Sequence, residues 1–178
     1  MPVHIVNYGR STLFKSSIYL DTNLLICAIN QTSHKYTQAA SLLGDLFAQN
    51  ITLSITHLVI DEYLWALLRA HYRNDTGSPL DPQLLKQNPT IISKYYHIIS
   101  TPLITLLGKS NLSIVSDNGL TRDITDEALK LMKNELLMPR DAFHLAFIIK
   151  LNIPGVVTSD PDFDNLKIPY YNLTIYKY

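Results

Sequence analysis

Four acidic residues stand where the sequence predicts that strands end or that helices begin. They are Asp21, Glu62, Asp141 and Asp160. In a parallel α/β layer, the carboxyl ends of strands and the amino ends of the following helices meet at one edge. We therefore expect these side chains to converge on one side of one sheet, where their charges repel each other. A divalent cation is the simplest neutraliser of such a group, and oxygen-only ligands predict Mg²⁺ or Mn²⁺ rather than zinc.

Each acid also has a structural explanation without chemistry. Asp21 and Asp160 could cap the helices that follow them, and Asp141 stands near a helix N-terminus, which favours negative charge. Glu62 differs, because the segments 58–60 and 63–65, on either side of Glu62 and its neighbour Asp61, are apolar. A carboxylate in apolar surroundings is costly unless a cation or a proton meets it. Glu62 is therefore the strongest single indication of a charged site.

Short apolar runs alternate with helical patterns along the chain. Strands are expected at 18–20, 51–55, 112–115, 155–158 and 171–176. Helical patterns are expected at 33–47 and 56–72, at 90–107 with an interruption at Pro102, from a cap at Asp123 or Thr125 to about 134, and at 139–151. This alternation favours crossover units that build a parallel sheet. The predicted fold class is a three-layer α/β/α fold with a central, mostly parallel twisted sheet.

The composition predicts one globular domain over residues 1–178. Hydrophobic residues make up 47% of the chain and charged residues 17%, which is enough for a core and too few charges for a disordered chain. The formal net charge of zero excludes a strongly basic overall balance. A single cysteine, Cys27, excludes an intramolecular disulfide and a thiolate zinc cluster. No apolar run approaches the length of a membrane span, and residues 1–17 lack the apolar core of a secretory signal, so we expect a soluble, cytoplasmic protein.

Four stretches of the sequence together resemble the PIN domain family. They occupy 18–23, 56–63, 140–146 and 157–163 and read IYLDTN, THLVIDEY, RDAFHLA and VTSDPDF. The branch that they most resemble is the VapC-type toxin ribonucleases. One such motif recurs by chance, whereas all four in this order across 18–165 are specific. Relative to a minimal toxin of this type, the chain carries an N-terminal extension at 1–17 and a helical insertion at about 74–110.

The resemblance implies which residues would form the active site. Its catalytic, metal-binding acids would be Asp21, Glu62, Asp141 and Asp160. Thr158 and Asn23 would support them. Asp162 is a further supporting acid that competes with Asp160 for the fourth position, and we prefer Asp160 because it lies nearer the strand end.

The resemblance also implies an activity and partners. The chain would be an endoribonuclease dependent on Mg²⁺ or Mn²⁺ and the toxin of a toxin–antitoxin system, with RNA as substrate, a cognate antitoxin as partner and a homodimeric state. Because the acids repel phosphate, cations must hold the RNA. Arg140 and Arg69 are the expected substrate-binding residues, and Arg73 and His144 are further candidates near the same edge. Arg69 shares the helix face of Glu62 and could instead pair with it. His144 is expected to be a core or surface histidine rather than a general base.

Two other function classes are weighed against this interpretation. A PIN-like fold kept as a non-catalytic RNA- or protein-binding module would have lost one or more acids, and here all four are present. A phosphohydrolase with Asp21 as nucleophile would need a second aspartate two residues later, where the chain has Asn23. The metal-dependent ribonuclease is therefore the leading interpretation.

Overall fold

The computed structural model describes residues 3–31, 33–49 and 51–178. Within them, six strands form one sheet in the order β1-β6-β5-β2-β3-β4, and every neighbouring pair is parallel. The strands are β1 (His4–Asn7), β2 (Ser17–Leu20), β3 (Thr52–Ile55), β4 (Leu112–Ile114), β5 (Gly155–Val157) and β6 (Thr174–Lys177). The central strands β2 and β5 are almost entirely buried, as expected for a parallel sheet covered on both faces.

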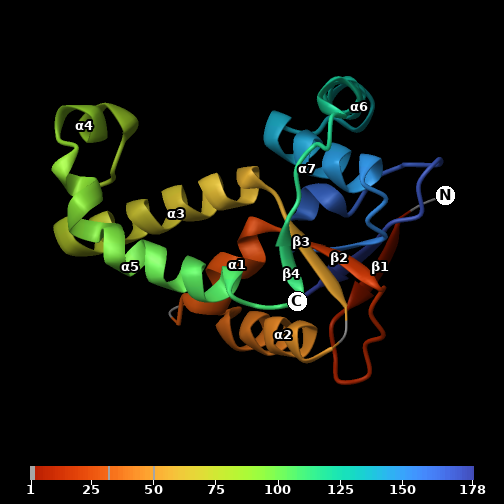
Figure 1. Cartoon of the computed structure of the whole chain (residues 1–178), viewed down its shortest axis with the longest axis horizontal. Coiled ribbons are helices and arrows are strands. Elements are labelled where there is room, and N and C mark those ends of the chain that lie inside the picture. The colour runs from red at the N-terminus through yellow and green to blue at the C-terminus, as the bar shows by residue number, and fades with distance from the viewer. Residues whose placement is uncertain (1–2, 32, 50) are drawn as a thin grey trace.

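The helices cover the sheet in layers. They are α1 (Thr22–Ile29), α2 (Tyr36–Ala48), α3 (His57–Thr76), α4 (Pro82–Gln87), α5 (Thr90–Leu107), α6 (Thr121–Glu135) and α7 (Pro139–Lys150), with the short 3-10 helix η1 (Pro161–Phe163). Figure 1 shows α6 and α7 together on one side of the sheet and α1 and α2 on the other, while α3 and α5 extend side by side away from it. The predicted three-layer α/β/α fold is therefore confirmed. Among the described residues, no helix is long and apolar enough to cross a membrane.

The packing at the centre of the sheet requires a glycine at the start of β5. A Cβ placed on Gly155 would lie 3.1 Å from Cγ1 of Ile18 and 3.2 Å from Cε2 of Tyr176. These atoms belong to the strands on either side of β5, and both side chains are buried. Gly155 therefore lets large side chains of β2 and β6 pack over the sheet at the strand that leads to Asp160.

Helices α3 and α5 form an extended pair, and the predicted interruption of α5 at Pro102 is wrong. The helix runs through that residue without a break. A proline inside a helix removes one backbone donor and costs about 3 kcal/mol. Buried apolar side chains continue on both sides of it and offset that cost through packing. They are Ile91, Tyr95, Ile99, Leu103 and Leu106.

The N-terminal extension contributes to the sheet. Residues 1–17 are expected only as an extension, but they contain β1, which pairs in parallel with β6. Most of its side chains are exposed, so the segment lacks the apolar character that predicts a strand. An edge strand needs only one bonded neighbour, and here that neighbour comes from the far end of the described chain.

Helix α6 begins earlier than its sequence pattern predicts. Its first residue is Thr121, with Leu120 in the N-cap position, rather than a residue after Asp123 or Thr125. The Thr125 hydroxyl donates to the carbonyl of Thr121 at 2.8 Å, a bond made inside a helix rather than at its start. Asp123 and Thr125 are of residue types that cap helices, but both lie inside α6, so the predicted start of this helix was wrong.

Candidate active site

One cavity at the carboxyl edge of the sheet, about 310 Å³ in volume, collects most of the predicted site residues. Those that line it are Asp21, Asn23, Glu62, Arg69, Arg140, Asp141 and Asp160. Thr158 is buried and contacts Asp21 from behind the cavity wall. The lining drawn from the described residues contains Asp160 but not Asp162.

The order of strands explains why the four acids meet. Asp21 occupies the N-cap position between β2 and α1, and Asp160 follows β5, the neighbour of β2. Glu62 lies in the second turn of α3, which follows β3 on the other side of β2. Asp141 lies in the first turn of α7. Three adjacent strands and one further helix therefore deliver the acids to one edge.

The Asp21 carboxylate is held at the end of β2 by two side chains. The Thr158 hydroxyl donates to its Oδ2 at 2.6 Å, and the Asn23 amide donates to the same oxygen at 3.3 Å. Burial raises the pKa of Asp21, and the Thr158 hydrogen bond offsets part of that rise. The Asp21 side chain thus faces the cavity although burial disfavours its charged form. An N-cap role alone does not explain this placement.

Glu62 is the most fully bonded of the four acids. Its Oε2 accepts from the Thr22 hydroxyl at 2.7 Å and from Nε2 of His144 at 3.1 Å. Its Oε1 lies 3.6 Å from the guanidinium of Arg140. Burial alone would raise the pKa of Glu62, but these bonds and the Arg140 charge outweigh burial and lower it. Glu62 is therefore held as a carboxylate.

A buried chain of hydrogen bonds leads to Glu62 through His144, and sequence reasoning missed it. Nδ1 of His144 lies 2.7 Å from the Tyr19 hydroxyl, which lies 2.8 Å from the hydroxyl of Thr56. A carboxylate only accepts, so Nε2 of the ring donates to Glu62. In the neutral ring, Nδ1 then accepts from Tyr19, and Thr56 donates to Tyr19. The sequence signal for this hydrogen-bond chain was the spacing of Asp141 and His144, which places both on one face of a helix.

Asp141 carries the clearest mark of crowding by like charges. Burial, and after it the charges of Asp160 and Asp21, together raise the pKa of Asp141 to about 6. Asp160 is fixed by local bonds: its Oδ1 accepts from the backbone N–H of Asp162 at 2.9 Å, and its own N–H donates to the Thr158 hydroxyl at 3.0 Å. Asp160 therefore faces the other acids, while Asp162 is exposed and serves the turn through its backbone.

The family model described as the PIN domain matches residues 18–169, which includes every acid of the cavity. The chain belongs to the PIN domain family. No curated protein matches the chain.

Solved structures share the fold of this PIN domain at low sequence identity. VapBC2 from Rickettsia felis, bound to a DNA fragment from its promoter, is 20% identical with a TM-score of 0.54, over 90% of this chain and 97% of that one. VapC20 of Mycobacterium tuberculosis, a Sarcin-Ricin loop cleaving toxin, is 14% identical with a TM-score of 0.56, over 85% and 98%. FitAcB from Neisseria gonorrhoeae is 14% identical with a TM-score of 0.50, over 89% and 96%. The PIN domain is thus of the VapC type in fold.

The two predicted cations of the PIN domain lie on the cavity wall in different settings. Arg140 reaches both Glu62, at 3.6 Å, and Asp61, at 3.9 Å, and its side chain is 57% exposed. Among the described residues, no ion pair joins Arg69 to Glu62, the alternative that the sequence left open. The Arg69 guanidinium instead lies 5.8 Å from the ring centre of Trp65. Both cations are therefore placed to meet an anion that enters the cavity.

The donor chemistry of the cavity fits a divalent cation, although the geometry is open. In the described part of the chain, no three His, Cys, Asp or Glu side chains stand close enough to form a metal-binding group. Mg²⁺, however, usually binds through one or two carboxylates and keeps several waters. The raised pKa values of Asp21 and Asp141 mark negative charge that a cation would relieve. The PIN domain therefore offers oxygen ligands of the right kind in an open arrangement.

Proposed function

We propose that the chain is a divalent-metal-dependent endoribonuclease that hydrolyses RNA phosphodiester bonds. The observation that carries the proposal is the meeting of four acids from separate elements on one cavity, with the pKa of Asp141 raised to about 6 by burial and by its acidic neighbours. Acidic side chains that destabilise one another are not expected at a sheet edge whose role is only structural. A site that binds a cation would require them.

The proposed ligands are the acids themselves. Asp21, Glu62, Asp141 and Asp160 would hold Mg²⁺ or Mn²⁺. A divalent ion supplies Lewis acidity, which activates a water and stabilises the leaving oxygen of a phosphodiester. Glu62 stays ionised through the bonds from Thr22 and His144.

The remaining residues orient the site and the substrate. Thr158 and Asn23 fix the Asp21 carboxylate through hydrogen bonds of 2.6 Å and 3.3 Å. Arg140 pairs with Glu62 before substrate arrives and can exchange part of that contact for a phosphate oxygen, since its side chain is largely exposed. Arg69 extends the cationic wall along α3. Asp162 supports the turn that aims Asp160.

We further propose that the protein is the toxin of a toxin–antitoxin pair, acting in the cytoplasm as a homodimer with a cognate antitoxin as partner. The support is the shared fold with VapBC2 and with a toxin–antitoxin complex from Klebsiella pneumoniae, the latter 18% identical with a TM-score of 0.50 over 87% of this chain and 99% of that one. The single-domain organisation, with the extension at 1–17 and the insertion at 74–110, belongs to the same proposal. The insertion region holds α4 and α5.

A non-catalytic RNA- or protein-binding module is the second candidate. The open arrangement of the acids in the described residues, without a closed metal group, favours it over a pre-assembled catalytic centre. Measuring Mn²⁺ binding by the purified protein separates the two candidates. The ribonuclease must bind the ion, whereas the binding module functions without it.

The deciding experiment measures cleavage of a mixed RNA pool by purified protein with Mg²⁺, with Mn²⁺ and with EDTA. We expect metal-dependent cleavage that disappears in Asp21→Asn. Asp126→Asn is the matched control, because Asp126 is an exposed aspartate of α6 outside the cavity. Cleavage that persists in folded Asp21→Asn, or that survives EDTA, would overturn the proposal.

A further inference from the structure

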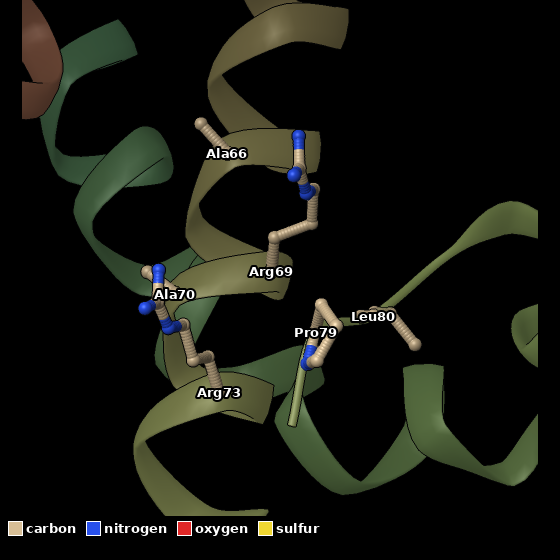
Figure 2. A pocket seen from close by; sticks show the side chains of 6 residues that line it. All are labelled: Ala66, Arg69, Ala70, Arg73, Pro79 and Leu80. Atoms are coloured by element: carbon tan, nitrogen blue, oxygen red, sulfur yellow. The ribbon is translucent and has the colours of Figure 1, made fainter. Parts of the chain in front are cut away.

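A second cavity adjoins the acidic one along α3. Its volume is about 260 Å³, and its lining residues are Ala66, Arg69, Ala70, Arg73, Pro79 and Leu80. Ala66 and Arg69 also line the acidic cavity, so the two hollows share a wall. Figure 2 shows the arginines one above the other on α3, with Pro79 and Leu80 of the following loop beside them. The surface next to the four acids is therefore a basic hollow.

Helix geometry places this hollow in line with the acids. At 100° per residue, Arg69 and Arg73 both lie within about 20° of Glu62 around the axis of α3. From Glu62 to Arg73 the helix advances about 16 Å, at 1.5 Å per residue. One stripe of α3 therefore runs from negative charge at the candidate active site to positive charge beyond it.

The two arginines are available for an anion. Among the ion pairs of the described residues, none includes Arg69 or Arg73, and both side chains are exposed. Ala66 and Ala70 add little bulk between them, which leaves room beside the helix. In Figure 2 both side chains extend toward the N-terminal end of α3, where the acidic cavity lies. Their charges therefore point back along the path to that cavity.

The chemistry of the hollow selects a phosphate group. A guanidinium presents a planar fork of donors that matches two phosphate oxygens, and two of them spaced one helical turn apart can hold a charged backbone. Contacts of this kind fix register without reading bases. The apolar rim of Pro79 and Leu80 offers no competing carboxylate.

We propose that Arg69 and Arg73 form a backbone-phosphate subsite that holds single-stranded RNA to one side of the bond that is cleaved. This inference rests on the proposed function and deepens it, because it assigns the path of the substrate strand. The strand would lie along α3, with one phosphodiester at the acids and a neighbouring phosphate in the basic hollow. Arg73, which the sequence offered only as one of several candidate cations, is then a substrate-positioning residue that acts together with Arg69.

The simplest opposing explanation is that Arg73 only stabilises α3. It stands in the last turn of the helix, where positive charge is favourable. In that case Arg73→Ala would lower the melting temperature and leave RNA affinity unchanged. If the subsite exists, Arg73→Ala should instead lose RNA affinity while it remains folded.

The first test measures binding of a fluorescent single-stranded RNA in EDTA, so that no cleavage occurs. Each lost phosphate contact should reduce the slope of log K against log salt by about 0.7, which is about fivefold in Kd at 0.1 M salt. Arg73→Ala and Arg69→Ala should each show this change, and the double variant about twice the change in slope. Arg122→Ala, which removes an exposed charge from α6 outside both cavities, is the matched control.

The second test measures cleavage kinetics on RNA oligonucleotides of increasing length with Mg²⁺. Arg73→Ala should raise KM and leave kcat unchanged, and only for oligonucleotides long enough to reach from the acids to the hollow. If wild type binds and cleaves RNA while Arg73→Ala matches Arg122→Ala in slope and KM, the subsite is wrong and the proposed function stands. If wild type neither binds nor cleaves RNA, both fall.

Discussion

Replacing Asp141 by asparagine should stabilise the metal-free protein at neutral pH while removing activity. The carboxylate of Asp141 lies in the acidic cavity, where burial and the charges of Asp160 and Asp21 raise its pKa to about 6. An acid whose pKa is raised by folding is less stable as an anion in the folded chain than in the unfolded chain. Asparagine keeps the shape and removes that charge, so the folded state loses a source of repulsion.

The size of this effect follows from the pKa shift. A rise from 3.8 to about 6 corresponds to about 3 kcal/mol, at 1.36 kcal/mol per pKa unit. The Asp141 side chain is only partly buried, and solvent screens such interactions strongly, so we expect about 1 kcal/mol. The penalty is fully present above pH 6, where Asp141 is ionised in both states. It fades as pH falls from 6 toward 4 and is absent once both states are protonated.

Urea unfolding in EDTA at a series of pH values from 4 to 8 measures this prediction. Asp141→Asn should exceed wild type in free energy of unfolding by about 1 kcal/mol at pH 7 and match it near pH 4. Asp126→Asn, an exposed control on α6, should stay within about 0.5 kcal/mol of wild type throughout. Equal or lower stability of Asp141→Asn at pH 7 would refute the reasoning, because burial and the neighbouring acids would then not destabilise the Asp141 carboxylate in the folded state. Added Mg²⁺ should stabilise wild type and not the variant.

Three further predictions test other parts of the structure. His144→Ala removes the Nε2 donor to Glu62 and should weaken Mn²⁺ binding by about 10- to 100-fold in a titration, with the fold retained by circular dichroism. Gly155→Ala places a Cβ against two buried side chains and should lower the free energy of unfolding by about 1–3 kcal/mol in urea. Burial would raise the pKa of Glu127, but bonds from Tyr170 and Lys150 outweigh it and lower that pKa. The stability from these bonds is therefore present above pH 4.5 and lost as pH falls below it, so Glu127→Gln should narrow the difference in unfolding free energy between pH 7 and pH 3.

The positions of the acids could be predicted because they depend on local rules. Asp21 and Asp160 each follow an apolar strand, and Pro139 marks the start of the helix that carries Asp141. In a parallel sheet these positions fall on one edge whatever the details of packing. Glu62 was identifiable because a charge among apolar neighbours needs an explanation.

The hydrogen-bonded support of the site could not be predicted in the same way. Tyr19 lies in the middle of a buried strand and has the sequence character of a core residue, and its bond to His144 joins residues far apart in the chain. The edge strand β1 and the unbroken course of α5 through Pro102 were missed for a related reason. Each is decided by contacts with another element, which outweigh the local preference of the segment.

The strand order has a consequence for synthesis on the ribosome. Strand β2 is made early but lies between β3 and β5, and β5 emerges only after residue 155. Strand β1, earlier still, must wait for β6 at Thr174–Lys177. A nascent chain that ends before β5 carries Asp21 and Glu62 without the strand that brings Asp160 to them. The acidic edge is therefore completed only when the last two strands of the sheet in chain order, β5 and β6, have been made.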